Sequence, residues 1–405
     1  MRSSAFIFGT DLLDEGHGTV LDRLQGAGLN SVTFSATYHD ARDVFPHNPR
    51  RRVFRNEGDV HWFPVDLARY PSGLVPRQAL AAAGADMLAD LCEQAQARGL
   101  GVTAWTIFTH NSALATAHPD CATHNVYGDP YLSDLCPAHP RVRAYCRELA
   151  ADVARRPVQR LLAESLHYRP LEHGEHHERY LIPLPLEARM LMSLCFCGHC
   201  QAAATCAGVD VPMLSNAIRS ALEPVWDGSL RPGQPLLADG ARDELERYVA
   251  VRCVTVTSLV AEVQEVLQPS GVAMTYVDHA GAMAHVMHGV SAEDDVLAAS
   301  RRLGIDPVAV AAVVDELCLL GYRDTPTRLG AMLARYRDVL APQARLSVAL
   351  RPLLPDCQDE GNLVSKIGLA AEAGVDGIEF YHYAMMPLNR LDWIRQGLRV
   401  AGSVA

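Results

Sequence analysis

Residues 364–383 read VSKIGLAAEAGVDGIEFYHY, and this stretch decides the fold class. Val364–Ala373 has the pattern of a helix, and Gly374 follows it in the position where a glycine commonly ends a helix. Gly377–Tyr383 then has the pattern of a short buried strand. Residues 27–32, AGLNSV, repeat the same join near the N-terminus. A helix that passes through glycine into an apolar strand is typical of folds that alternate helices with parallel strands.

Short apolar runs continue this alternation along the whole chain. Helical patterns such as Thr19–Ala27 and Ala79–Ala97 lie between them. Eight such units, with no glycine-rich phosphate motif after the first strand, favour a closed barrel over a doubly wound open sheet. We therefore predict an α/β protein, a single (β/α)8 TIM barrel over residues 1–405. The predicted strands are Ala5–Gly9, Ser31–Thr37, Val102–Phe108, Gln159–Glu164, Val272–Asp278, Leu317–Tyr322, Leu346–Leu350 and Gly377–Tyr383.

Two of the predicted connections are too long to be simple turns. One follows strand 2, from Tyr38 to about Pro76, and the other follows strand 4, over about residues 165–270. Both begin at the C-terminal end of a strand. Active sites of barrel enzymes lie at that end, so we expect both loops to border the site.

The overall composition excludes some classes of partner. Of the 405 residues 49% are hydrophobic, enough for a large core, and the net charge is −11. That charge argues against nucleic acid or an anionic membrane as the main partner. We find no run long and apolar enough for a transmembrane helix and no secretory signal, and we therefore predict a cytoplasmic protein. A homo-oligomer is compatible with the sequence.

Three of the eleven cysteines form a C-x-C-x-x-C motif, at Cys195, Cys197 and Cys200. In a cytosolic chain this spacing indicates a metal site, because three thiolates in one short loop can occupy three corners of a zinc tetrahedron. Cys136 is the best candidate for the fourth corner. Four thiolates leave no open position, so we expect a structural Zn2+ that pins the loop after strand 4 to the loop after strand 3. The alternative fourth ligands are Cys206, His199, His173, His176 and His177.

Three blocks of the sequence resemble one known family. In order they are His118-Pro-Asp…Leu135-Cys-Pro-Ala-His-Pro, Leu161-Leu-Ala-Glu164 and Cys195-Phe-Cys-Gly-His-Cys-Gln. Over roughly Trp105 to Gln201 they resemble the catalytic barrel of family 42 glycoside hydrolases, the zinc-containing β-galactosidases. The resemblance implies that Cys136 joins the C-x-C-x-x-C motif around the zinc. It also implies that Glu164 is the acid/base glutamate.

The chain departs from that family at two positions. Ala163 stands where the family has an asparagine before the acid/base residue. Strand 7 ends in Leu350-Arg351-Pro-Leu-Leu-Pro-Asp356, with no glutamate in the position of the family's nucleophile. These departures indicate chemistry other than the retaining double displacement.

Hydrolysis of a glycosidic bond uses two carboxylates. We expect Glu164 to have a raised pKa in a partly closed pocket, which suits proton donation. Asp278, at the end of strand 5, is the first choice for the second carboxylate. Glu379 in strand 8 is the next, because strand alternation places it on the same face as Tyr381.

Other polar side chains follow the predicted strand ends, and His279 is among them. Such groups make paired hydrogen bonds to hydroxyl-rich ligands. The predicted substrate-binding residues are His110, Asn111, His167, His173, His176, His177, Tyr322, Arg351 and Tyr381.

Together these features predict a glycosidase-like enzyme that acts on a small sugar, glycoside or glycosylated metabolite by acid/base chemistry. Two alternatives remain open. One is a repurposed glycosidase scaffold that catalyses elimination or isomerisation of a sugar-like metabolite. The other is an inactive sugar-binding protein.

Overall fold

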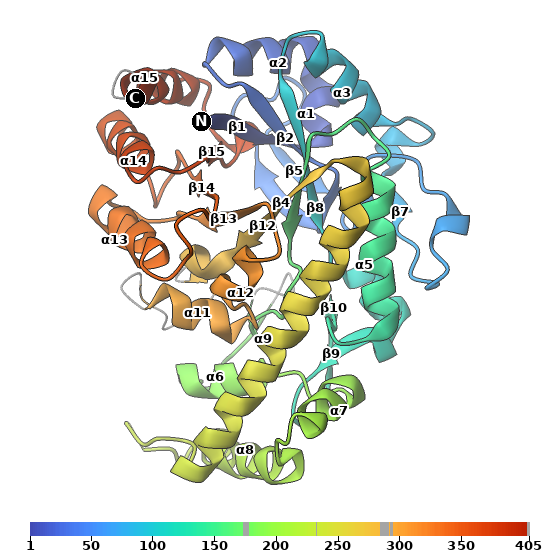
Figure 1. Cartoon of the computed structure of the whole chain (residues 1–405), viewed down its shortest axis with the longest axis vertical. Coiled ribbons are helices and arrows are strands. Elements are labelled where there is room, and N and C mark those ends of the chain that lie inside the picture. Colours follow the sequence, from blue (N-terminus) through green and yellow to red (C-terminus); the bar gives the residue numbers. More distant parts are fainter. Residues whose placement is uncertain (173–177, 232, 284–290, 292–294, 403–405) are drawn as a thin grey trace.

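Eight parallel strands form a closed barrel, in the order β1-β15-β14-β13-β12-β11-β8-β2 (Figure 1). The computed structural model describes residues 1–172, 178–231, 233–283, 291 and 295–402. The predicted barrel is confirmed, and each predicted strand overlaps one of its strands. Their bounds are β1 Arg2–Ile7, β2 Ser31–Ser35, β8 Gly101–Ile107, β11 Arg160–Glu164, β12 Ala273–Asp278, β13 Glu316–Leu320, β14 Leu346–Leu350 and β15 Gly377–Phe380.

Helices cover the outside of the barrel and bury their apolar faces against it (Figure 1). In the stretch 364–383, α14 (Glu360–Glu372) ends before Gly374, whose φ of 66° is in the left-handed region, and β15 follows. No helix among the described residues combines the length and hydrophobicity that a membrane crossing needs. The other helices around the barrel are α1 Gly9–Glu15, α2 His17–Gly26, α3 Met87–Gln96, α5 Pro140–Val153, α11 Val296–Arg302, α12 Pro307–Ala311, α13 Pro326–Arg337 and α15 Arg390–Gly402.

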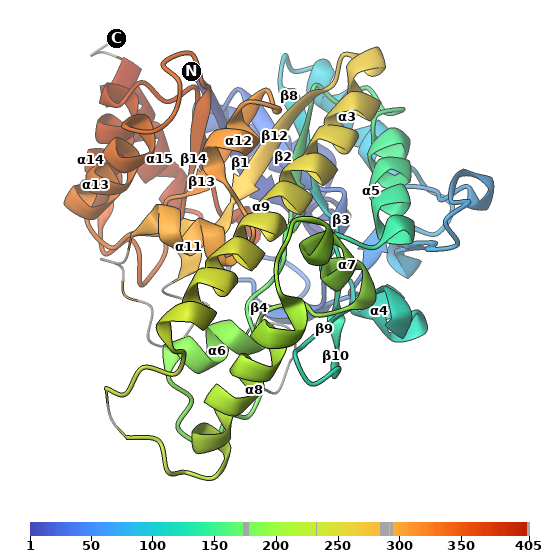
Figure 2. The ribbon, with the colours of Figure 1, turned by 60° about the horizontal axis from the view of Figure 1, so that its bottom comes forward.

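The segment between β11 and β12 forms an extension beside the barrel (Figure 2). It contains α6 (Leu186–Met192), α7 (Gly198–Cys206), α8 (Val211–Trp226) and the long α9 (Asp239–Leu267). Its buried side chains form a hydrophobic cluster of their own, to which α9 contributes its N-terminal half. The C-terminal half of α9 packs into the main core. One helix therefore joins the two hydrophobic cores.

Short strands shape the loops at the C-terminal end of the barrel. After β2, β4 (Ala41–Val44) pairs with β5 (Val53–Asn56) in an antiparallel hairpin. A second small sheet joins β3 (Thr37–Tyr38), β6 (Val60–His61) and β7 (Arg77–Gln78). After β8 come α4 (Ser112–Ala117) and the pair of β9 (Ala122–His124) with β10 (Pro130–Leu135).

A buried ion-pair network lies among β1, β13 and β15. The guanidinium of Arg2 donates to both oxygens of Glu316, at 2.5 and 2.9 Å, and to Glu379 Oε1 at 2.9 and 3.1 Å. The other oxygen of Glu379 accepts hydrogen bonds from the hydroxyls of Ser4 and Thr33. Both carboxylates are almost wholly buried. Burial raises the pKa of Glu316, but the hydrogen bonds and charge of Arg2 outweigh it and hold that pKa below its ordinary value.

This network corrects the expectation that Glu379 pairs with Glu164. Glu379 does share a face with Tyr381, but it lies two residues earlier on the strand, where its partners are Arg2, Ser4 and Thr33. Its carboxylate therefore serves the packing of the barrel.

We predict that Arg2→Met lowers the free energy of unfolding by about 3–5 kcal/mol near neutral pH, because two buried carboxylates lose their shared cation. Urea unfolding followed by circular dichroism measures the loss. The deficit should shrink as the pH falls, since protonated carboxyls no longer need the cation. Arg345→Met is the matched control. Arg345 is half exposed, and its guanidinium is 4.0 Å from Glu316, too far for a hydrogen bond. Equal effects of the two substitutions would contradict the prediction.

Candidate active site at the barrel mouth

A cavity of about 330 Å³ opens at the C-terminal ends of the barrel strands. Glu164 is the last residue of β11, and Tyr381 directly follows β15. The cavity thus occupies the place where barrel enzymes bind substrates. The lining residues are Phe6, Tyr38, His39, Ala41, Asp43, Trp105, Glu164, His167, Arg169, Pro170, Val277, His279, Ala282, Met283, Leu303, Leu320, Tyr322, Arg351 and Tyr381.

Glu164 is held by a hydrogen-bonding group at each carboxylate oxygen. The indole Nε1 of Trp105 donates to Oε2 at 2.5 Å. His279 Nε2 lies 3.3 Å from Oε1. Trp105 projects from β8, which pairs with β11, and His279 directly follows β12 on the other side. The two neighbouring strands therefore fix the orientation of the carboxylate.

A chain of hydrogen bonds continues from His279 to the backbone. His167 Nδ1 lies 2.6 Å from the carbonyl oxygen of Tyr168, and His167 Nε2 lies 2.8 Å from His279 Nδ1. A carbonyl oxygen only accepts, so His167 Nδ1 carries a proton. Burial, followed by the charge of His279, holds the pKa of His167 well below its ordinary value, so this ring is neutral and its Nε2 accepts. His279 Nδ1 is therefore the donor.

This direction of donation determines where the next proton lies. With Nδ1 of His279 already protonated, a hydrogen bond between its Nε2 and Glu164 needs one more proton, on either partner. Burial raises the pKa of Glu164, but the hydrogen bond and charge of His279, with smaller contributions from His39 and Trp105, leave it below its ordinary value. The raised pKa expected from the sequence is thus wrong. Because the pKa of Glu164 is lowered, its carboxylate is the acceptor in this contact and His279 Nε2 faces it as the donor.

Asp43 is the second carboxylate of the cavity, and the sequence analysis missed it. It lies on β4, where alternate side chains are more buried, and it lines the cavity together with Ala41. Burial raises the pKa of Asp43 to about 6, although Asn56 Nδ2 donates to it at 3.1 Å. The alternation over residues 41–44 is in the burial of the strand and not in the sequence Ala-Arg-Asp-Val, so the sequence carries no period-two signal for Asp43.

Two tyrosine hydroxyls lie within electrostatic reach of both carboxylates. Tyr38 Oη and Tyr381 Oη are 3.2 Å apart. Burial raises the pKa of each hydroxyl, and the charges of Asp43 and Glu164 both add to the rise. The tyrosines therefore stay protonated and offer neutral hydrogen bonds to a ligand.

Arg351 occupies the end of strand β14, where the resembling family has its nucleophile. Its guanidinium lies 4.5 Å from the ring centroid of Tyr322 and forms an ion pair with Asp356. Arg169, also in the lining, pairs with Asp134 at 2.9 Å. A cation thus stands in the place of the expected carboxylate.

The structure corrects the expectation that Asp278 faces Glu164. The carboxylate of Asp278 is fully buried and accepts hydrogen bonds from Ser300 Oγ, at 2.8 and 2.9 Å, and from Tyr336 Oη at 2.8 Å. These partners belong to α11 and α13, outside the barrel. The preceding residue, Val277, is the one that faces the cavity, as strand alternation requires.

The predicted substrate-binding residues divide into three groups. His167, Tyr322, Arg351 and Tyr381 line the cavity. His110 stacks on His39 outside the lining, and Asn111 caps α4 by accepting from Leu114 N at 2.8 Å. His173, His176 and His177 lie outside the described residues.

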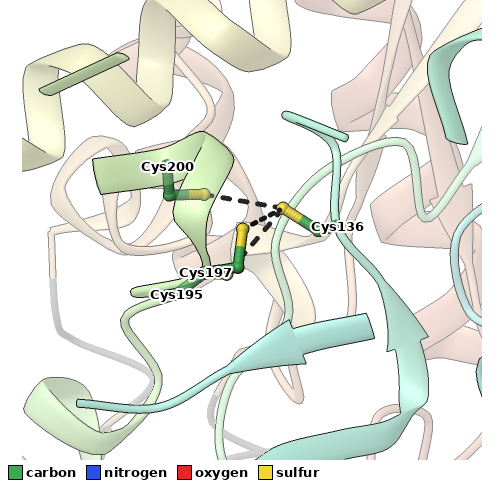
Figure 3. A group of neighbouring side chains, drawn as sticks. All are labelled: Cys136, Cys195, Cys197 and Cys200. Carbon is green, nitrogen blue, oxygen red and sulfur yellow. Dashed lines mark hydrogen bonds between the residues drawn. The ribbon is translucent and has the colours of Figure 1, made fainter. Parts of the chain in front are cut away.

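Four buried cysteines meet beside the barrel, and their ligand atoms lie within 4.8 Å of one another (Figure 3). Cys136 follows β10, Cys195 and Cys197 precede α7, and Cys200 is in its first turn. Sγ of Cys136 lies 3.5 Å from Cys197 and from Cys200, and 3.8 Å from Cys195. In a tetrahedral site with Zn–S bonds of about 2.3 Å, the sulfur atoms are about 3.8 Å apart. The arrangement therefore fits zinc. Cys206 is exposed and outside the group.

Hydrogen bonds support two of these sulfur atoms. The backbone N–H of His124 lies 3.4 Å from Cys195 Sγ, and the hydroxyl of Tyr168 lies 3.3 Å from Cys200 Sγ. Tyr168 also provides the carbonyl that fixes the tautomer of His167. The cysteine cluster and the cavity therefore share a supporting residue.

No family model matches the chain, and no curated protein matches it. Solved structures do. The whole chain aligns with 58% of a β-galactosidase from the Antarctic haloarchaeon Halorubrum lacusprofundi, at 12% identity and a TM-score of 0.59. The whole chain also aligns with 59% of a β-galactosidase from the psychrophilic Marinomonas ef1, at 10% identity and a TM-score of 0.56.

An α-L-fucosidase from Paenibacillus thiaminolyticus gives a TM-score of 0.52 at 12% identity, with 99% of this chain and 49% of that enzyme aligned. The chain thus spans about half to three-fifths of these enzymes. At such identities the likeness shows the fold alone: a barrel of the form found in these glycoside hydrolases.

We predict that a pH-dependent change in Trp105 fluorescence reports protonation of Glu164, since its indole donates to that carboxylate. In the wild type the midpoint should lie below the ordinary glutamate range. His279→Leu should raise the midpoint, because burial of Glu164 then acts without its cationic partner.

Glu164→Gln is the control that should abolish this transition, which separates Trp105 from the other three tryptophans. An unchanged midpoint in His279→Leu would rule out His279 as the cause of the lowered pKa of Glu164.

Proposed function

We propose that this chain is a glycosidase-like enzyme that hydrolyses a small glycoside or glycosylated metabolite with inversion at the anomeric carbon. The observation that carries the proposal is the 3.3 Å contact between His279 Nε2 and Glu164 Oε1, in a cavity that Asp43 also lines. An inverting enzyme needs one group that delivers a proton and one that accepts it. The likeness to glycoside hydrolase barrels is consistent with this reaction but does not select it.

The His279–Glu164 pair supplies the acid. Glu164 takes a proton from His279 and passes it to the leaving oxygen as the glycosidic bond breaks. His167, whose tautomer is fixed by the Tyr168 carbonyl, accepts from His279 Nδ1 throughout and keeps the imidazole in position. The pair ends the step as a neutral imidazole and a carboxylate.

Asp43 supplies the base. It accepts a proton from a water molecule, and the remaining hydroxide forms the new bond to the anomeric carbon. With a pKa of about 6 it is ionised near neutral pH and still basic enough to accept. Solvent then returns the proton from Asp43 to His279, and the cycle closes without net change in the protein.

Retention by double displacement is disfavoured by the cation at the end of β14. A guanidinium cannot act as the nucleophile that retention requires at this position, and the carboxylate of Asp356 is engaged in an ion pair with Arg351. The same cation favours a second candidate function, in which Arg351 stabilises an oxyanion during elimination or isomerisation of a sugar-like metabolite.

We also propose that the cysteine cluster holds a structural zinc. Four thiolates would fill the coordination sphere, so the ion would serve to join the loop after β10 to α7. No step of the proposed reaction involves it.

We predict that Glu164→Gln and Asp43→Asn each lower kcat/KM by about 10²–10⁴-fold, since each removes one proton-transfer group. For Glu164→Gln the loss should be larger with alkyl glycosides than with nitrophenyl glycosides, whose leaving groups need little protonation. In the wild type, kcat/KM should rise with pH through about 6 as Asp43 ionises, and Asp43→Asn should lose this limb.

Asp40→Asn is the matched control, since Asp40 lies in the same loop, pairs with Arg55 and does not line the cavity. NMR of the first-formed anomer tests inversion. Retention, or turnover unaffected by Asp43→Asn, would overturn the mechanism. Thermal stabilisation by sugars without any turnover would instead indicate a sugar-binding protein. Exchange of deuterium into a sugar carbon would favour isomerisation.

For the metal we predict about one equivalent of zinc per chain by elemental analysis. Cys200→Ser should lose the zinc and lower the Tm, because the extension then loses its link to β10. Cys206→Ser should retain the zinc and the wild-type Tm, since Cys206 is exposed and outside the cluster. A zinc-free wild type with an unchanged Tm in Cys200→Ser would contradict the site.

A further inference from the structure

A second cavity, of about 240 Å³, lies between α6, α9 and α11, behind the wall of the first. Pro170 and Leu303 line both cavities and therefore form part of the wall between them. None of the residues in the proposed reaction lines the second cavity. The proposed reaction therefore assigns no role to the second cavity.

Arg252, on α9, is a buried cation with spare hydrogen-bonding groups in this lining. The residue is only 2% exposed. Its Nη1 donates to the carbonyl of Arg302 at 3.0 Å, and its guanidinium lies 4.3 Å from the ring centroid of Tyr168. Among the described residues, no acceptor reaches its Nε or Nη2. Buried charged donors without partners are costly, so these two N–H groups are matched to a ligand that accepts hydrogen bonds.

Two further arginines line the same cavity from the C-terminal end of α11. They are Arg301 and Arg302, and Nη1 of Arg302 is also buried without an acceptor among the described residues. Within the described part of the chain, Glu246 is the only acidic side chain in the lining. Three guanidinium groups against one carboxylate leave the cavity with a positive charge. An oxyanion would relieve their mutual repulsion, and the forked guanidinium matches carboxylate and phosphate geometry.

The remaining wall is apolar. Leu191 and Leu194 contribute from the α6 side, Leu245 and Val249 from α9, and Leu303 from the end of α11. An inorganic ion alone would leave this surface without contacts. We propose that the cavity binds a small organic anion, a carboxylate or phosphate monoester on a compact apolar body. The volume limits that body to about one ring, because larger ligands occupy pockets of about 300–1,000 Å³.

This site does not depend on the proposed hydrolysis. Its link to the first cavity is structural: Arg252 covers the ring of Tyr168, and the carbonyl of Tyr168 holds His167. The test therefore measures binding and not activity, so failure of one proposal leaves the other standing.

Calorimetric titration of the full chain with phenyl phosphate, benzoate, inorganic phosphate and phenol tests the proposal. Phenyl phosphate or benzoate should bind at least tenfold more tightly than inorganic phosphate or phenol, since only they combine an oxyanion with an apolar ring. Arg301→Gln should weaken that binding at least tenfold, and added salt should weaken it further.

Arg252→Gln should act in the same way, and Arg301→Gln keeps the test valid if the buried substitution impairs folding. Arg247→Gln is the matched control, because Arg247 lies on α9 outside this lining and pairs with Glu244. The proposal is overturned if neither organic anion binds the wild type. It also fails if Arg301→Gln and Arg247→Gln bind equally, or if phenol matches phenyl phosphate.

Discussion

Closure of the parallel strand ladder is the constraint on which the rest of this structure depends. β1 pairs with β2 on one side and with β15 on the other, so residues from the two ends of the chain are adjacent. Because all eight strands are parallel, their carboxyl ends meet at one mouth, and Tyr38 and Tyr381 come within hydrogen-bonding distance there. Charges buried inside the barrel need a partner close by, and Arg2 neutralises two buried carboxylates in this way.

Local patterns predicted the barrel because each strand is a short apolar run between helices, and Leu346–Leu350 matches its strand at both ends. They predicted the cysteine group because thiols at that spacing have few other uses. They failed for Asp278 because a residue at a strand end can face either way, and only neighbours such as Ser300 and Tyr336 decide which. Asp43 was missed because its position depends on a hairpin whose partner strand begins ten residues after it, at Val53.

The two carboxylates at the barrel mouth, Glu164 and Asp43, have different electrostatic surroundings. Glu164 is buried beside a histidine and an indole, so its charge is compensated by fixed donors. Among the residues that the structure describes, the side chain that donates to Asp43 is the uncharged amide of Asn56, and burial outweighs it and raises the pKa of Asp43. Two carboxylates in one cavity thus differ in proton affinity because their hydrogen-bond partners differ. In the proposed reaction, that difference would allow one side to deliver a proton while the other accepts one.

Tyr168 has a consequence for how the parts of the molecule communicate. Its hydroxyl meets Cys200, its ring meets Arg252 and its carbonyl meets His167, so one rigid side chain and its peptide contact three sites. If occupancy of any of these sites displaces Tyr168, the free energies of the other two change with it. Thermodynamic linkage makes such effects reciprocal: if the proposed anion changed the affinity of the cysteine cluster for a metal, the metal would change the affinity for the anion by the same factor.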